Sequence, residues 1–273
     1  AASFIGTLQA GYTDFHYLRP EWKEITEREA LIGVSMTGIA AGNVLSLDKT
    51  EAALAVVEEN ARVAKIIGIN EAARTTTIKP EGSTSVVLGT SSGIHAWHND
   101  YYIRRVRVGK NEALYTYMVN NFPELVEDCQ FKPHIEAVMS FPQKAPDGAI
   151  TRDESALDFL ERVKTFNLEW IRPGHRSGAN YHNVSCTASI RENEWETVGQ
   201  WLWNNRDTYT GISVLPYDNG TYVQAPFENI DKETYESMLA KFHGINIDDV
   251  KEHEDNTTLV ETPACAGGMC EIV

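Results

Sequence analysis

Apolar residues recur along this chain in two patterns, one typical of helices and one typical of strands. From Phe4 to Phe15 they stand three or four residues apart, which predicts a helix. Two capping boxes predict where longer helices begin. Asp48-x-x-Glu51 opens a helix that ends before Gly68, and Thr151-x-x-Glu154 opens one that ends at Pro173. Shorter helices are predicted over residues 111–120, 192–205 and 232–242.

Short segments rich in β-branched and aromatic residues lie between these helices. Because strands and helices alternate, the connections are expected to be crossovers and the sheet or barrel to be largely parallel. The fold class is therefore α/β. No repeat or linker interrupts the pattern before the C-terminal tail. Residues 1–247 are therefore predicted to form one domain and residues 248–273 an extension. The predicted strands cover residues 75–78, 101–108, 137–141, 182–189 and 212–215.

Composition and charge narrow the class of protein. Of the 273 residues, 42% are hydrophobic and 23% charged, which is enough to bury a core. A net charge of −15 argues against nucleic acid or an anionic membrane as the main partner, because both are bound through clustered Lys and Arg. No apolar stretch approaches the length of a membrane span and no signal segment opens the chain, so we predict a cytoplasmic protein.

The last residues hold two of the four cysteines of the chain. Cys265 and Cys270 flank two glycines and follow a polar segment, from about residue 248, that cannot bury enough apolar surface to fold alone. About twenty flexible residues reach on the order of 25 Å, so the tail could carry accessible thiols into a cleft for disulfide exchange. A structural disulfide or half of a zinc site is the alternative, although His253 with both cysteines supplies only three zinc ligands.

A second candidate site follows the predicted strand at 75–78. The segment Pro80-Glu81-Gly82-Ser83-Thr84-Ser85 combines a glycine, which lets a ligand approach the backbone, with three hydroxyl residues beside a helix start. Backbone N–H groups and hydroxyls of this kind bind phosphate, and would let an acidic chain hold a nucleotide. No Gly-Lys-Ser/Thr follows, so the segment is not a Walker loop. The alternative is an ordinary turn with a Ser or Thr helix cap.

Several segments resemble ribonucleotide reductases, and most closely the adenosylcobalamin-dependent (class II) enzymes of the monomeric type. Residues 76–85 and 89–95 resemble the phosphate-binding segment of that family, whose form Pro-x-Gly-Thr-x-Ser has Ser83 here in place of Thr. The match runs nearly end to end in one order, which is more specific than any single motif. Its other segments are residues 8–15, 33–38, 101–107, 174–187 and 215–226.

The resemblance implies a fold, a reaction and roles for both candidate sites. The fold would be the second half of a ten-stranded α/β barrel with a flexible C-terminal tail. The enzyme would reduce ribonucleotides, expected as ribonucleoside triphosphates, to 2′-deoxyribonucleotides by thiyl-radical chemistry with adenosylcobalamin as the radical source. Cys265 and Cys270 would re-reduce the active-site disulfide and be recharged by thioredoxin or a similar reductant. The substrate phosphates would be held by Pro80, Glu81, Gly82, Ser83, Thr84 and Ser85.

Part of the machinery of that family has no counterpart in the sequence. The Asn-x-Cys-x-Glu segment that supplies the radical cysteine does not occur, and in the family it lies just upstream of what matches Ala1. Cys129, on a predicted helix end, is expected to be incidental, and Cys186 to be packed in the core. We therefore expect an upstream N-terminal part of the reductase, in the same or a separate polypeptide, without which this chain is inactive.

Two other functions are considered. The large subunit of class I reductases also ends in Cys-x4-Cys and carries a tyrosine pair, but Tyr101-Tyr102 lies within an alternating strand and is expected to have a structural or rim role. The segments around the phosphate loop and 174–187 argue against class I as well. A non-catalytic redox or interaction module could keep the fold without the chemistry. His95 and His98 lack a third ligand, so no metal site is expected.

Overall fold

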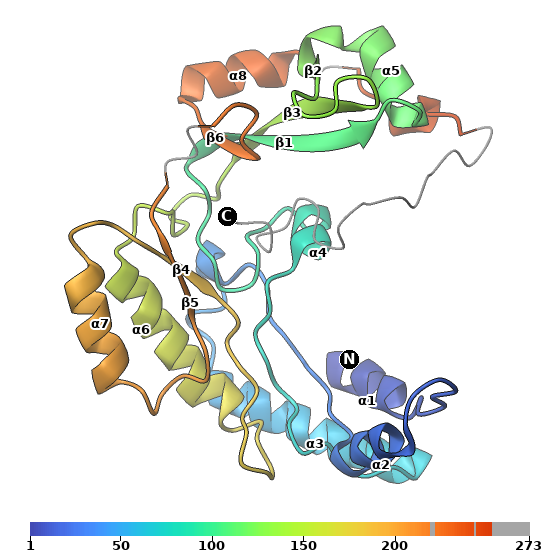
Figure 1. Ribbon diagram of the computed structural model, residues 1–273, viewed down its shortest axis with the longest axis vertical. Coiled ribbons are helices and arrows are strands. Elements are labelled where there is room, and N and C mark those ends of the chain that lie inside the picture. Colours follow the sequence, from blue (N-terminus) through green and yellow to red (C-terminus); the bar gives the residue numbers. More distant parts are fainter. Residues whose placement is uncertain (219–221, 243, 253–273) are drawn as a thin grey trace. The chain divides into compact units, whose positions relative to one another are not determined.

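The computed structural model describes residues 1–218, 222–242 and 244–252 (Figure 1). The chain forms two compact units. Residues 1–96 and 154–217 make the first unit, and residues 97–153 with the described residues from 218 onward make the second. Cys265 and Cys270 lie outside the described residues. The domain boundary expected at residue 247 stays a prediction.

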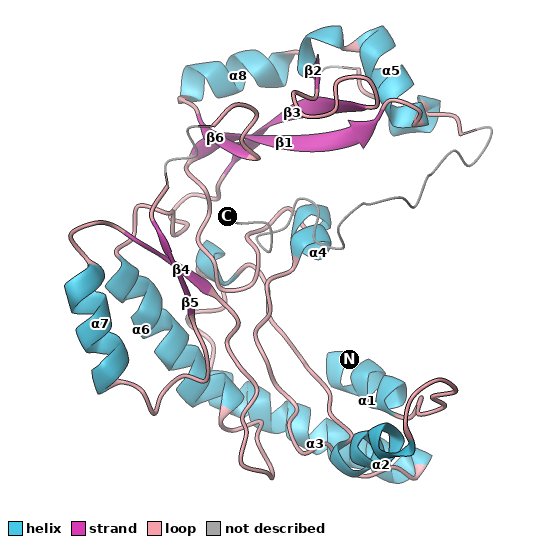
Figure 2. Ribbon diagram, viewed as in Figure 1, coloured by secondary structure: helices cyan, strands magenta, loops and turns pink. Residues whose placement is uncertain are grey.

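Most of the regular elements of the first unit are helices, and the second unit is built on a sheet (Figure 2). The main elements of the first unit are α1 (Ala2–Ala10), α2 (Pro20–Glu29), α3 (Lys49–Ile67), α4 (Gly82–Val87), α6 (Ala156–Phe166), β4 (Thr187–Ile190), α7 (Trp195–Asn204) and β5 (Ser213–Pro216). Those of the second are β1 (Tyr101–Gly109), α5 (Ala113–Asn121), β2 (Val126–Asp128), β3 (Glu136–Lys144), β6 (Phe227–Asn229) and α8 (Lys232–Ala240). Short 3₁₀ turns lie at Ile39–Ala41, Pro123–Leu125 and Ile247–Asp249.

The start and end predicted for α3 are confirmed. The Asp48 carboxylate accepts a hydrogen bond from the backbone N–H of Glu51 at 2.9 Å. Gly68 takes a left-handed conformation and its N–H bonds to the carbonyl of Ala64. Both ends of the helix therefore satisfy backbone groups that a helix terminus leaves open.

The start predicted for α6 is wrong by four residues. Ser155 caps this helix by accepting a hydrogen bond from the N–H of Asp158 at 3.1 Å. Thr151 instead forms a backbone bridge with Trp97, and the carboxylate of Glu154 binds Arg162. Two consecutive segments, residues 151–154 and 155–158, have the capping pattern, and tertiary pairing removes the first of them from the helix.

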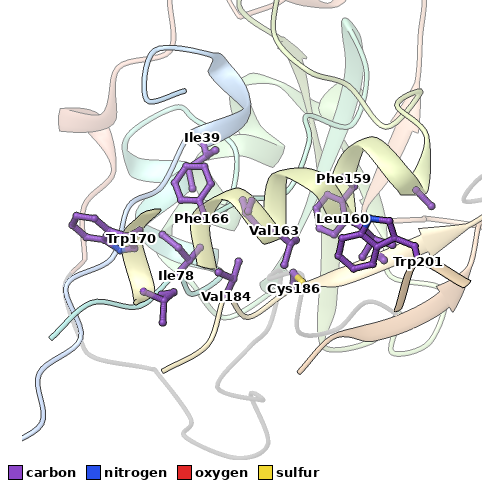
Figure 3. Packing of buried hydrophobic residues seen from close by; sticks show 14 of the residues in the cluster. Ile39, Ile78, Phe159, Leu160, Val163, Phe166, Trp170, Val184, Cys186 and Trp201 are labelled. Carbon is purple, nitrogen blue, oxygen red and sulfur yellow. The ribbon is translucent and has the colours of Figure 1, made fainter. Parts of the chain in front are cut away.

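The core of the first unit lies along α6 and the π-helical segment Asn167–Ile171 that continues it (Figure 3). The period predicted for this helix places one apolar face inward. Leu160, Val163, Phe166 and Trp170 on that face are at most 2% exposed, and Leu157 is half-buried. They pack with Ile39, Ile78, Val184 and Cys186 from the segments opposite.

The parallel pairing predicted for the strands is confirmed in the first unit. β4 pairs with β5 in parallel, with Thr187 opposite Ser213. The predicted strand at 75–78 forms isolated parallel bridges, one between Thr76 and Val34 and one between Ile78 and Val184. This extended segment is thus paired on both of its edges.

In the second unit the prediction of parallel strands is wrong. Its sheet has the order β2-β3-β1-β6, and every neighbouring pair is antiparallel. Val108 of β1 lies opposite Ala137 of β3, and both cluster with Met139 of β3 and Met118 of α5. Alternation specifies which face of a strand is buried and leaves the direction of its neighbour open, so the sequence pattern could not distinguish the two arrangements.

No helix among the residues that the structure describes is long and apolar enough to cross a membrane.

The packing of Gly174 predicts a localised sensitivity to added volume. A Cβ at this position would lie 2.8 Å from the Cβ of Thr76, which is buried and paired on its own strand. We expect Gly174→Ala to lower the free energy of unfolding by about 1–3 kcal/mol, measured by urea denaturation. Gly199→Ala, on the exposed side of α7 with no atom within 4 Å, is the matched control and should gain up to about 1 kcal/mol. Equal losses in the two variants would contradict the packing argument.

Candidate functional site

The predicted phosphate-binding segment forms the start of the short helix α4. Glu81 occupies the N-cap position without a side-chain capping bond, so a Ser or Thr helix cap is not what this segment provides. The first intrahelical bond runs from the N–H of Ser85 to the carbonyl of Glu81, so the amides of Gly82, Ser83 and Thr84 precede it. Ser83 and Thr84 are exposed, whereas Ser85 is buried with its hydroxyl 3.2 Å from the carbonyl of Gly82.

Hydroxyl groups from two other segments fix the backbone of this loop. The N–H of Glu81 donates to Ser92 Oγ at 2.8 Å, and the N–H of Lys79 donates to Ser35 Oγ at 3.1 Å. Thr37 links the two supports, because its Oγ1 accepts from the N–H of Gly93 and donates to the carbonyl of Ser91. The structure thus brings residues 33–38, a separate segment of the resemblance, together with residues 79–85 and 89–95 of the phosphate-binding segment.

Gly93 allows the closest of these approaches. Its φ is +54°, a left-handed conformation that favours glycine, and an added Cβ would lie 2.6 Å from the carbonyl oxygen of Lys79. Position 93 therefore requires glycine for two reasons, the left-handed backbone conformation and the close approach of the Lys79 carbonyl.

His95 connects this loop to the core. It is 5% exposed, and its ring stacks on Phe159 with centroids 5.9 Å apart. The N–H of Thr187 donates to Nε2 at 3.1 Å, so Nε2 accepts and the neutral ring carries its proton on Nδ1, which lies 3.2 Å from the carbonyl of Ser92. The pKa of His95 is lowered to about 4, mainly by burial; the hydrogen bond to Ser92 opposes this shift and the charge of Arg162 adds to it.

A buried ion pair lies behind His95. Arg162 binds the carboxylate of Glu154 through both terminal nitrogens at 2.7 and 2.6 Å, and it also donates to the carbonyl of Ile94. Its guanidinium lies over the ring of Phe159. The sequence did not lead us to predict this ion pair. A charged residue among the apolar residues of α6 was nevertheless a signal that Arg162 has a buried partner.

The two histidines of the His95-x-x-His98 segment lie in different units. His98, in the second unit, is 3.1 Å from Arg152 through Nδ1 and stacks on Phe227. Burial lowers its pKa to about 4 as well. Among the described residues, no group of three or more His, Cys, Asp or Glu is placed to hold a metal ion.

The two described cysteines are both buried. Cys186 lies in the core of the first unit, as predicted, and burial raises the pKa of its thiol to about 12. Cys129 follows β2, so the predicted helix end is wrong, and its N–H bonds to the carbonyl of Glu136. A thiol held protonated in a core is a poor nucleophile, so Cys186 does not resemble a reactive site. The role of Cys265 and Cys270 stays a prediction.

The fold is that of part of a class II ribonucleotide reductase. A crystal structure of a B12-dependent (class II) ribonucleotide reductase matches 92% of this chain and 39% of that chain, with a TM-score of 0.75 and 24% sequence identity. The mixed α/β fold class is confirmed by this likeness.

The curated relatives carry a more particular name. An adenosylcobalamin-dependent ribonucleoside-triphosphate reductase from Lactobacillus delbrueckii subsp. bulgaricus is 29% identical over 228 residues, which is 80% of this chain and 29% of the relative. A protein of the same name from Euglena gracilis is 28% identical over 232 residues, 81% of this chain and 30% of the relative. The resemblance seen in the motifs is confirmed. The chain spans about 29% of the length of the relatives from Lactobacillus, and no family model matches it.

The buried neutral ring of His95 predicts a loss of stability in acid. The unfolded chain takes up a proton here near its ordinary pKa of 6.5, whereas the folded chain does so only near 4. Protonation of His95 should therefore not change the free energy of unfolding above about pH 6.5. As the pH drops from there toward 4, it should lower the free energy of unfolding by at most about 3 kcal/mol. In urea denaturation, His95→Gln should reduce the slope of stability against pH across this range. An unchanged slope would contradict the prediction.

Proposed function

We propose that this chain is part of an adenosylcobalamin-dependent ribonucleotide reductase, a cytoplasmic enzyme that converts ribonucleoside triphosphates to 2′-deoxyribonucleotides by thiyl-radical chemistry. Its contribution is to hold the phosphates of the substrate and to re-reduce the active site. The observation that carries the proposal is the convergence of residues 33–38, 79–85 and 89–95 at the start of α4, in a chain whose relatives are named as such reductases.

The loop is suited to an anion although the chain is acidic. Lys79 and Glu81 flank Pro80 with opposite charges, so side-chain charge within the loop nearly cancels. The attraction must come from the amides of Gly82, Ser83 and Thr84, which precede the first intrahelical bond, and from the exposed hydroxyls of the latter two. Ser85 is buried and its hydroxyl is bonded within the turn, so we propose that its part in phosphate binding is to shape the loop.

The resemblance implies a cobalamin that is held without a histidine on cobalt, and the contacts of His95 and His98 are compatible with this arrangement. Both ring nitrogens of His95 are engaged, by Ser92 and by Thr187, and Nδ1 of His98 is engaged by Arg152. When bound, adenosylcobalamin supplies the radical that begins the reaction. The role of the residues of this chain is to bind and orient the triphosphate.

The upstream part of the reductase is a proposed partner, and thioredoxin or a similar reductant is another. The upstream part would supply the radical cysteine, which none of the four cysteines here can provide in an Asn-x-Cys-x-Glu context. Cys265 and Cys270 would reduce the disulfide formed in each turnover by exchange through a mixed disulfide, and thioredoxin would then reduce them.

Reconstitution tests the proposed function. This chain together with an upstream part that carries the Asn-x-Cys-x-Glu segment should reduce ribonucleoside triphosphates only when adenosylcobalamin is present, measured as deoxynucleotide formed. Either polypeptide alone should show no turnover. A requirement for a metal-containing second subunit would favour a class I large subunit instead. No turnover under either condition would favour a non-catalytic module with the same fold.

The tail cysteines predict a reductant-dependent defect. In the reconstituted enzyme, Cys265→Ser with Cys270→Ser should stop multiple turnovers with thioredoxin, because no dithiol then carries electrons to the active site. Activity with dithiothreitol, which reaches the active site directly, should remain. Met269→Leu lies between the two cysteines and leaves both thiols in place, so it should behave as the unmodified chain does. Equal loss with both reductants would contradict the shuttle.

A further inference from the structure

His95 is the connection between the candidate phosphate loop and the core. Its ring spans two segments that are far apart in sequence, since Nδ1 faces the carbonyl of Ser92 and Nε2 accepts from the N–H of Thr187 at the start of β4. The N–H of His95 also donates to the carbonyl of Ser92 at 3.0 Å. The position of Ser92 is therefore tied to the sheet through one side chain.

Ser92 also contacts the loop, through its side-chain hydroxyl. While its carbonyl is held by His95, its Oγ accepts from the N–H of Glu81 at 2.8 Å. Glu81 directly precedes the three amides at the start of α4. The hydrogen bonds thus form a continuous path from Thr187 through His95 and Ser92 to Glu81.

The His95 ring itself has little freedom to move. Phe159 stacks against it with an interplanar angle of 27°, and Arg162, which lies over Phe159, holds the adjacent carbonyl of Ile94. Both ring nitrogens have partners in a buried place, so a rotated or protonated ring would leave a buried group unpaired. These contacts hold the ring in one orientation and one tautomer.

We propose that His95 is a positioning residue for substrate phosphate: through Ser92 it fixes the amides at the start of α4, and so sets the affinity of the loop for a triphosphate. The inference rests on the proposed function, because it takes residues 79–85 to be the phosphate-binding loop. His95 is not itself a ligand, since both of its nitrogens are engaged within the protein.

Amide hydrogen exchange and phosphate binding, both measured on the full 273-residue chain, test the inference. His95→Phe keeps a ring that can stack on Phe159 and removes both nitrogens. It should speed exchange in peptides covering residues 79–93 by about tenfold. Affinity for inorganic tripolyphosphate, measured by calorimetry, should fall by a similar factor. His98→Phe, a half-buried histidine of the second unit, is the matched control and should change neither value.

A double-mutant cycle with Ser92→Ala separates positioning from a general loss of packing. Ser92→Ala should weaken tripolyphosphate binding about as much as His95→Phe, and the double variant should bind no more weakly than Ser92→Ala alone, because both changes break one path. His95→Gln, whose amide oxygen can still accept from Thr187, should restore part of the affinity.

Several results would overturn the inference. Unchanged exchange over residues 79–93 in His95→Phe would do so, as would independent losses of affinity that multiply in the double variant. Tripolyphosphate binding that is equal in wild type and His95→Phe would reject the inference and leave the phosphate loop intact. Absence of binding in the wild type would reject the loop assignment itself, and with it the inference. If amide exchange in His95→Phe is rapid throughout the first unit, that variant has lost packing in general. Amide exchange and tripolyphosphate binding measured on His95→Gln then test the inference in its place.

Discussion

The buried extended segment Thr75–Ile78 is the constraint on which the first unit depends. Backbone bonds pair it with Val34 on one edge and with Asn183 and Ser185 on the other. Its threonine hydroxyls donate across the core to carbonyls about a hundred residues away, with Thr76 Oγ1 only 2.6 Å from the carbonyl of Trp170. A segment buried on both faces must satisfy all of its polar groups internally, and these side chains do so.

This constraint explains why the candidate site has a defined shape. The loop at 79–85 begins directly after the buried segment, so its first residues leave the core at a fixed point. Ser35, on the neighbouring segment, and Ser92, on the returning one, then bind the amides of Lys79 and Glu81. The functional candidates Ser83 and Thr84 are exposed at the end of a backbone that is held on both sides. Hydrogen-bond donors on a rigid backbone favour the binding of an anion, because the donors need no rearrangement on binding.

Local patterns in the sequence predicted elements well where the signal was itself local. The Asp48 cap and the Gly68 end of α3 are set by residues within one turn of each terminus, and both are confirmed. The apolar period of α6 likewise identified the buried face that includes Leu160 and Phe166. The start of that helix was wrong because Thr151 pairs with Trp97, a contact between residues more than fifty positions apart.

The sequence alone predicted most of the longer helices and indicated the two candidate sites and the resemblance to class II reductases, because these signals come from short segments of the chain. Only the tertiary structure decided that the strands of the second unit run antiparallel and that His95 and Ser92 support the loop beneath α4. Strand direction and hydrogen bonds between distant segments are set by how the chain returns on itself. The spacing of residues along the chain carries no direct record of that path.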